Sequence, residues 1–261
     1  MNPWQAPSPA LADLRPGRVR RYAGGVLEVE FPPGLPPAAP GQFVMVDLGD
    51  SALPHPFTPF RTLAGGGFTL LLRPQGRPVA ALLARRRAGQ AVRLFGPLGR
   101  PFPPPPLGAR AFAVAESGRI APLHLLVRLL GEAGGVTLFV GGDDDAHFAA
   151  LAAFRLPGVR IERRRGGGWP AVEAALARAG TDDVLYAAAP EPALARLDRA
   201  LGKPGRQGPR AFLALEVAMA CGVGACYGCP VPLRRPPDPR RPYARACADG
   251  PVFPAGEVAL G

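Results

Sequence analysis

The chain has 261 residues, 48% of them hydrophobic, which is enough to bury the cores of one large domain or of two to three small ones. Its formal net charge of +11 would suit a nucleic-acid-binding protein, but the basic residues are scattered, and no basic helix or alternation of basic with aromatic residues is present. No apolar stretch approaches the roughly 20 residues that span a bilayer, and the first residues lack the apolar run of a secretory signal, so we expect a cytoplasmic protein without nucleic-acid or membrane partners.

Residues 1–102 are predicted to form an antiparallel β-barrel. Short apolar or alternating runs, each long enough for one strand, follow one another at the spacing of hairpins and are separated by glycine and proline. The proline-rich stretch at 31–41 is expected to be a loop, because proline has no backbone N–H to offer a central strand. The expected strands are RVRRY (18–22), VLEVEF (26–31), QFVMVDL (42–48), FTLLLR (68–73) and AVRLFG (91–96).

Residues 103–203 alternate between short apolar runs and helical spacing, which predicts a doubly wound parallel sheet of the nucleotide-binding type. Ligands of such sheets bind at the carboxyl ends of the strands. The expected strands are AFAVA (111–115), VTLFV (136–140), GVRIE (158–162) and VLYAA (184–188), and the expected helices lie at 120–134, 147–153, 171–179 and 192–201.

Residues 204–261 contain all four cysteines of the chain: Cys221, Cys226, Cys229 and Cys247. A segment of this size needs a metal centre or packing on other domains to be stable, and cytosolic thiols are more often ligands or catalysts than disulfides. The gaps match the C-x4-C-x2-C run with a distant fourth cysteine of a plant-type [2Fe-2S] site. We therefore predict such a cluster with the four thiolates as its ligands.

Three glycines, Gly222, Gly224 and Gly228, lie between the cysteines of this run. We expect them to adopt positive φ so that backbone N–H groups turn toward the sulfur atoms. The alternative is a structural zinc site, which four thiolates would satisfy equally well. Zinc ligands usually come as two separate pairs of neighbouring cysteines, whereas here three share one loop, so the spacing favours iron–sulfur.

The stretch ALEVAMACGVGACYGCPVPL (214–233), with RACADGPVF (245–253), resembles the C-terminal iron–sulfur segment of the electron-transfer subunit of class 1B dihydroorotate dehydrogenase. PGQFVMV (40–46), FGPLG (95–99) and RIAPL (119–123) look like further landmarks of that family. The resemblance therefore covers nearly the whole chain in order.

Such a resemblance implies an FAD-binding β-barrel at 1–102, a ferredoxin-reductase-like α/β domain at 103–203 and a small [2Fe-2S] domain at 204–261. In that family, electrons leave dihydroorotate at an FMN on a separate catalytic subunit, cross the cluster to FAD and reduce NAD. The resemblance thus implies an oxidoreductase component of pyrimidine biosynthesis that works in a hetero-oligomer with the FMN-carrying subunit.

The family's flavin motif resembles Arg-Pro-x-Ser, and the matching residues here are His55, Pro56, Phe57 and Thr58. Threonine keeps the hydroxyl that would face the flavin ring, whereas neutral histidine lacks the charged fork of arginine, and Arg61 follows as another cation. A second element, which resembles Gly-x-Gly-Thr, corresponds to Gly76-Arg77-Pro78-Val79. Proline removes a backbone donor there, and Arg77 would supply charge to the pyrophosphate instead.

The dinucleotide motif departs furthest from the family pattern. The family's motif resembles Gly-Gly-x-Gly-x-Ala-Pro, and the matching residues here are Glu116-Ser117-Gly118-Arg119-Ile120-Ala121-Pro122. Glu116 brings a negative charge toward a negative pyrophosphate, which Arg119 would only partly offset. The later motif resembling Cys-Gly-Pro-x-Pro reads Ala188-Ala189-Pro190-Glu191-Pro192, and Asp143 to Asp145 lie where a partner of the adenosine phosphate is expected. We therefore expect NAD binding to be weak or absent.

Two other functions are open at this stage. A flavin and iron–sulfur reductase component could serve a different partner enzyme. A degraded reductase scaffold without a working flavin could keep the cluster, or zinc, as a structural adaptor. His124, on the apolar stretch after Pro122, is expected to be packed or interfacial rather than catalytic.

Overall fold

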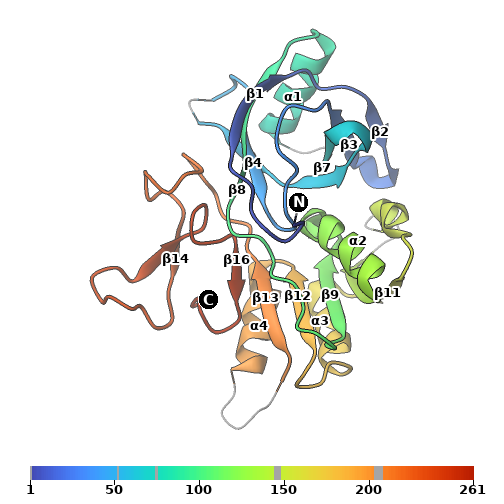
Figure 1. Ribbon diagram of the computed structural model, residues 1–261, viewed down its shortest axis with the longest axis vertical. Helices are drawn as coiled ribbons and strands as arrows, with labels where there is room; N and C mark the ends of the chain where they lie inside the picture. The colour runs from blue at the N-terminus through green and yellow to red at the C-terminus, as the bar shows by residue number, and fades with distance from the viewer. Residues whose placement is uncertain (1, 52, 74–75, 144–147, 203–207) are drawn as a thin grey trace.

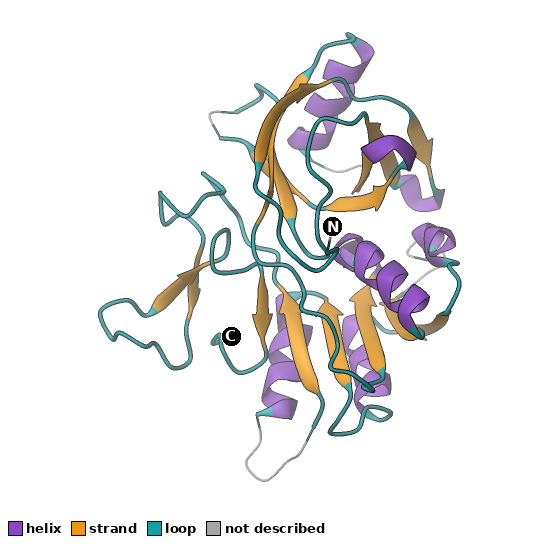
Figure 2. Ribbon diagram, in the orientation of Figure 1, coloured by secondary structure: helices purple, strands orange, loops and turns teal. Residues whose placement is uncertain are grey.

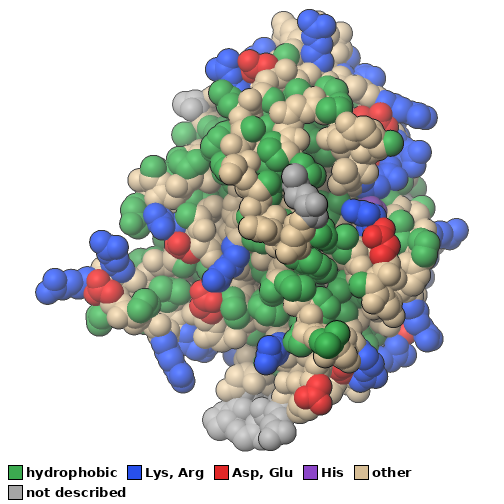
Figure 3. Space-filling model, in the orientation of Figure 1, with side chains coloured by type: hydrophobic (Ala, Val, Ile, Leu, Met, Phe, Trp, Pro, Cys, Tyr) green, Lys and Arg blue, Asp and Glu red, His purple; other side chains and the backbone are tan. Residues whose placement is uncertain are grey.

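The computed structural model describes residues 2–51, 53–73, 76–143, 148–202 and 208–261. Figure 1 shows a β-barrel in the upper half of the view, a layered α/β body in the lower half and a C-terminal segment at the left. Figure 2 shows helices beside the strands of the α/β body and a further helix at the top of the view, and in Figure 3 the Lys and Arg side chains are scattered over the visible face. The predicted fold class is confirmed. Among the residues described, no helix combines the length and apolar character needed to cross a membrane.

The barrel consists of two four-stranded antiparallel sheets around one hydrophobic core. Val29, Val46, Leu70 and Leu94 come from both sheets and are fully buried in it. One sheet has the order β1 (Ala10–Leu14), β8 (Val92–Leu98), β4 (Phe43–Asp47) and β5 (His55–Phe57). The other has the order β2 (Val19–Arg21), β3 (Leu27–Phe31), β7 (Phe68–Leu72) and β6 (Pro59–Thr62).

Helix α1 (Arg77–Arg87) lies in the barrel domain, where the sequence predicts only strands. It buries no residues other than Val79 and Leu82, and three arginines occupy its last turn. The helix therefore has little of the apolar periodicity by which a helix is recognised in a sequence. The proline-rich stretch between β3 and β4 is a loop, as predicted.

The α/β body has a six-stranded sheet covered on both faces. Helix α2 (His124–Ala133) packs on one face, and α3 (Gly168–Leu176) and α4 (Glu191–Leu201) pack on the other, which confirms the doubly wound prediction. The strand order is β11 (Val159–Arg165), β10 (Val136–Gly142), β9 (Ala111–Glu116), β12 (Val184–Ala188), β13 (Arg210–Ala214) and β16 (Val252–Pro254), and β16 runs antiparallel to β13.

The helix predicted at 147–153 is instead a six-residue 3₁₀ helix at Ala149–Phe154, and His147 lies outside the described residues. Pro157 and Gly158 follow closely, so the segment ends before a longer α-helix can form. The apolar spacing of this segment therefore predicts a helical backbone correctly, but it does not predict that the helix is of the 3₁₀ type.

The C-terminal segment packs on both of its neighbours. Strands β13 and β16 extend the parallel sheet, while β14 (Pro230–Pro232) and β15 (Tyr243–Arg245) form a separate hairpin. Phe43 and Met45 of the barrel share a hydrophobic cluster with Val231 and Phe253. Since β13 pairs with β12, the sheet continues past residue 203, and the division of the chain at residues 102 and 203 stays a prediction.

A buried carboxylate ties the C-terminal segment to α4. Asp198 accepts hydrogen bonds from the backbone N–H of Gly256 and from the guanidinium of Arg234. Its side chain is 1% exposed. Because the charge is both paired and hydrogen-bonded, it meets the conditions under which a carboxylate is stable in a protein interior.

His124 joins the barrel to the α/β body. Its ring lies against Phe60 and Phe154, with centroid distances of 4.5 and 4.9 Å, and its Nε2 donates to the carbonyl oxygen of Ala153 at 3.0 Å. Burial lowers the pKa of His124 to about 4, so the ring is neutral at physiological pH. The residue is packed at an interface, as the sequence predicts.

We expect His124 to make the free energy of unfolding depend on pH between 6.5 and 4. In this window the unfolded chain binds a proton that the folded chain excludes, so stability falls as the pH falls, by about 3 kcal/mol in total. The variant His124→Phe keeps the aromatic packing but cannot titrate. Urea unfolding of both proteins at several pH values measures the effect as their difference. Parallel curves for the two proteins would contradict it.

Candidate functional site

The four cysteines meet at one end of the C-terminal segment. Cys221, Cys226 and Cys229 lie on the loop between β13 and β14, which we call the cysteine loop, and Cys247 follows β15. The antiparallel pairing of β14 with β15 brings Cys247 back to Cys229, and their sulfur atoms are 3.3 Å apart. None of the four forms a disulfide.

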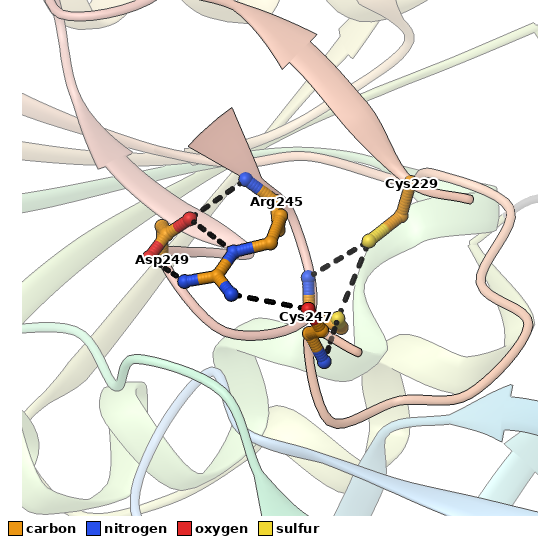
Figure 4. Close-up of polar contacts among 5 residues, drawn as sticks. Cys229, Arg245, Cys247 and Asp249 are labelled. Carbon is orange, nitrogen blue, oxygen red and sulfur yellow. Dashed lines mark hydrogen bonds and ion pairs between the residues drawn. The ribbon is translucent and has the colours of Figure 1, made fainter. Parts of the chain in front are cut away.

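Each sulfur atom accepts at least one backbone hydrogen bond. The N–H of Gly224 donates to Cys247 at 3.1 Å, and that of Gly228 donates to Cys226 at 3.3 Å. The N–H of Cys247 donates to Cys229 at 3.4 Å (Figure 4). Cys221 accepts from the N–H groups of Val223 and Cys226. Donors aimed at sulfur stabilise negative charge on it, so the loop is built for thiolates.

The thiols differ in pKa, and a bound cation must stabilise the thiolate form of the one with the highest pKa. The backbone N–H groups of Val223 and Cys226 lower the pKa of Cys221 to about 6, whereas burial raises the pKa of Cys247 to about 12. Without a cation, the thiol of Cys247 therefore stays protonated at neutral pH. A metal centre offsets the cost of its ionisation and releases its proton.

The thiols are arranged as two pairs. The Sγ atoms of Cys229 and Cys247 are 3.3 Å apart, and the side chain of Cys226 helps to lower the pKa of Cys221. A tetrahedral zinc needs its ligands around one ion, whereas a two-iron cluster can take one thiolate pair on each iron. The donor set and its pairing fit a [2Fe-2S] cluster better than zinc.

The glycines of the loop meet two different requirements. Gly222 and Gly224 have positive φ, at 74° and 78°, as predicted. Gly228 does not, and Tyr227 beside it adopts a φ of 55° instead, so the prediction for Gly228 was wrong. Its small size is needed for another reason: a Cβ at this position would lie 3.3 Å from the sulfur atom of Cys226.

Arg245 fixes the cysteine loop to the turn that follows Cys247. Its Nη1 donates to the carbonyl oxygen of Gly224 at 3.0 Å, and its Nε lies 3.1 Å from a carboxylate oxygen of Asp249 (Figure 4). On the solvent side, Val223 and Tyr227 are 50% and 59% exposed and flank the exposed Cys226. We call these three residues the rim of the cysteine loop.

A cleft of about 470 Å³ separates the barrel from the carboxyl edge of the parallel sheet. Its volume is within the range of ligand pockets, and His55, Pro56, Phe57 and Thr58 all line it. The opposite wall includes residues 214–217 and Met219, which lies two residues before Cys221. The cleft and the cysteine site therefore adjoin each other.

The structure does not place Gly76 and Arg77 in the wall of this cleft, where Pro78 and Val79 lie instead. Both residues are exposed at the start of α1, and Nη2 of Arg77 donates to the carbonyl oxygen of Asp50 at 3.3 Å. The carboxylate of Asp50 lies 3.0 Å from His55 Nε2, so one short loop connects the two candidate elements. As ligands of FAD, all these residues stay predictions.

Arg61, the other candidate cation of the flavin motif, is already paired. Its Nε lies 2.6 Å from a carboxylate oxygen of Glu28, its Nη2 contacts the same carboxylate, and Glu28 is 1% exposed. Tyr22 also donates to Glu28, at 2.6 Å. Moving Arg61 toward a phosphate would leave the buried carboxylate of Glu28 without its cation, and Arg61 does not line the cleft.

Two charged residues at the cleft give no signal in the sequence. Arg73 follows β7, Glu216 follows β13, and both line the cleft together with Arg119 from the turn after β9. Glu216 Oε2 lies 2.6 Å from Arg119 Nε, and Glu216 Oε1 lies 4.0 Å from Arg73 Nη2. Because the three residues come from distant segments, only the folded chain brings them together.

The barrel, the doubly wound sheet and the cleft between them define a ferredoxin-reductase-like fold. In this chain the fold also carries a four-cysteine centre. Two solved structures agree on the fold. One is an NADH-dependent reduced ferredoxin-NADP oxidoreductase, with a TM-score of 0.77 and 21% identity over 95% of this chain and 90% of that one. The other is the ferredoxin reductase in carbazole 1,9a-dioxygenase, with a TM-score of 0.65 and 19% identity over 78% and 69% of the two chains.

Sequence comparison is more specific. A family model described as the iron–sulfur cluster binding domain of dihydroorotate dehydrogenase B matches residues 216–259. Dihydroorotate dehydrogenase B (NAD(+)) electron transfer subunits from Bacillus caldolyticus and Geobacillus thermodenitrificans (strain NG80-2) are each 34% identical to the chain, over 85% of its length and 87% of theirs. The chain belongs to this family of dihydroorotate dehydrogenase B electron transfer subunits.

We expect Gly222→Ala to destabilise the cysteine loop more than a matched substitution elsewhere. A Cβ at Gly222 would lie 2.5 Å from Cγ of Met45, whereas at Gly256, which has a similar φ of 85°, it would meet no atom within 4 Å. Both alanines suffer the backbone strain, but only Gly222→Ala adds a clash, which should cost at least about 1 kcal/mol more. Thermal unfolding and metal content of both variants test this, and equal losses would contradict it.

Proposed function

We propose that this chain is the electron-transfer subunit of a cytoplasmic class 1B dihydroorotate dehydrogenase that acts in pyrimidine biosynthesis. Electrons from dihydroorotate reach the chain by way of the FMN of a separate catalytic subunit. They pass through a [2Fe-2S] cluster and are delivered to FAD in the cleft. The ligands of the cluster are Cys221, Cys226, Cys229 and Cys247. The observation that carries this proposal is that the two sites adjoin, since Met219 lines the cleft two residues before Cys221.

The chain's own residues hold the two sites in a fixed relation. Phe43 lines the cleft, and Met45, two residues further along the same strand, packs against Gly222 of the cysteine loop. The loop is thus anchored on a barrel strand that also forms part of the cleft wall. When bound, the cluster would carry single electrons and the flavin would hold two.

The thiolates and the groups that donate hydrogen bonds to them influence the reduction potential of the cluster. Backbone N–H groups stabilise negative charge on sulfur, and more donors make an added electron less costly. Arg245, whose guanidinium is fixed by Asp249, adds a positive charge behind the loop. These residues therefore set the reduction potential, while Thr58 and His55 in the cleft wall are the groups available to orient a flavin.

The rim of the cysteine loop is where we expect the catalytic subunit to bind. Val223 and Tyr227 are exposed apolar side chains on either side of an exposed thiol. An electron donor must approach the cluster closely, and exposed aromatic residues are typical of protein interfaces. The partner would then cover the rim, and the cleft adjoins the cysteine site through Met219.

We expect the purified chain to be brown, with iron and acid-labile sulfide in equal amounts and no stoichiometric zinc, because two thiolate pairs suit two irons. Replacement of Cys229 by Ser should abolish the iron and the visible absorption of the cluster. Metal analysis, absorption and EPR spectra after anaerobic dithionite addition measure this. A colourless, EPR-silent protein loaded with zinc would refute the cluster and favour a structural adaptor.

We expect Thr58→Val to weaken FAD binding about fivefold, since it removes one hydroxyl that lines the cleft at nearly constant volume. The matched control Thr62→Val changes an exposed threonine at the end of β6, on the neighbouring strand, and should leave the affinity unchanged. Titration of the flavin-free protein with FAD, followed by the quenching of flavin fluorescence, gives both dissociation constants. Equal affinities of the wild type and Thr58→Val would remove Thr58 from the flavin site.

A further inference from the structure

The parallel sheet has one position at which a dinucleotide would be expected to bind. In the order β11, β10, β9, β12, β13, the connections leave β9 and β12 toward opposite sides, so a crevice opens outside the carboxyl ends of these two strands. Dinucleotides of such folds place their pyrophosphate there, on backbone N–H groups and the positive end of a helix. The crevice must therefore offer glycines, free donors and no negative charge.

Glu116 is the last residue of β9 and stands at this crevice. Its Oε2 lies 3.2 Å from the position of a Cβ built on Gly168, the first residue of α3. The Cβ atoms of Ala189 and Ala193 lie 3.5 and 3.4 Å from the same point, so the carboxylate sits where the end of β12 and the starts of α3 and α4 come together. The positive end of α3 is thereby occupied by a negative charge of the chain itself.

The turn after β9 carries one cation, Arg119, and a second, Arg73, lies beside it, but both lie within ion-pair distance of Glu216. Arg119, its one cation, lies 2.6 Å from a carboxylate oxygen of Glu216, and the guanidinium of Arg73 lies 2.9 Å from the position of a Cβ on Gly118. The turn is thus covered on its barrel side by an arginine and ion-paired on its sheet side. An incoming pyrophosphate would have to break the pair of Arg119 with Glu216 and would still face Glu116.

We infer that Glu116 closes this crevice to nicotinamide dinucleotides, so that the chain does not bind NAD there. The inference rests on the proposed function and deepens it, because it concerns which molecules can reach the reduced subunit. In lacking NAD binding at this crevice, the chain would differ from what the names of its relatives, which include NAD(+), indicate for them. The carboxylate acts by charge, since it would lie beside two negative phosphate groups.

The test is NAD⁺ binding to the complete complex with the catalytic subunit in its oxidised state, measured by isothermal titration calorimetry. The wild type should show no saturation below a concentration on the order of 1 mM. Glu116→Gln removes the charge at constant size, Glu116→Gly also frees the space, and both should bind NAD⁺ at least about tenfold more tightly. Glu132→Gln, which removes a charge from the exposed surface of α2, should leave binding unchanged.

Saturable binding to the wild type at micromolar NAD⁺ would overturn the inference. If the wild type does not bind and neither Glu116 variant gains affinity, Glu116 is not the cause and the inference also fails. Folding of the variants is checked by circular dichroism and by their iron and flavin content. The proposed function is tested separately by bleaching of flavin and cluster with dihydroorotate, which does not depend on NAD⁺.

Discussion

Sulfur atoms that bear negative charge inside a protein need hydrogen-bond donors and cations around them, and the C-terminal segment of this chain is organised by that need. The N–H of Gly224 donates to Cys247, and the positive φ of Gly222 and Gly224 permits this turn of the cysteine loop. Hairpin pairing of β14 with β15 delivers Cys247 to the same place. Neither element has a large core of its own, so the loop relies on the barrel residues Phe43 and Met45 for support.

This support explains why the cleft and the cysteine site lie together. Strand β4 contributes to both, and the segment from Leu215 to Cys221 runs directly from the cleft wall into the loop. Glu216 in that segment pairs with Arg119 of the same wall and lies 4.0 Å from Arg73 of the barrel. The barrel, the sheet and the C-terminal segment therefore meet at one cluster of charged side chains that lines the cleft. A shift of any of the three parts would move these side chains.

The sequence predicts those parts of the fold that depend on local pattern. Five of the eight barrel strands, the alternation of strands and helices and the four-cysteine set have clear spacing signals, whereas β1, β5 and β6 are not predicted. Helix α1 has none, because it buries little more than Val79 and Leu82 against the barrel. The residues 204–261 also appear separate in the sequence, yet β13 continues the parallel sheet, because a strand's partner is not encoded in its own residues.

The same distinction holds at the sites. His55 to Thr58 could be placed at a ligand cleft from their motif, and all four line it. The ion pair of Arg61 with Glu28 could not be foreseen, since 33 residues separate the two in sequence. Nor could the role of Gly228, whose small size matters because of its distance to the Cys226 sulfur rather than because of its φ.

X-ray absorption at the iron edge of the anaerobically purified protein shows directly whether two thiolate pairs hold two irons. We expect an all-sulfur first shell around iron, together with scattering from a second iron atom at short distance, as bridging sulfide requires. A first shell of nitrogen or oxygen, or a sulfur shell without an iron neighbour, would contradict it.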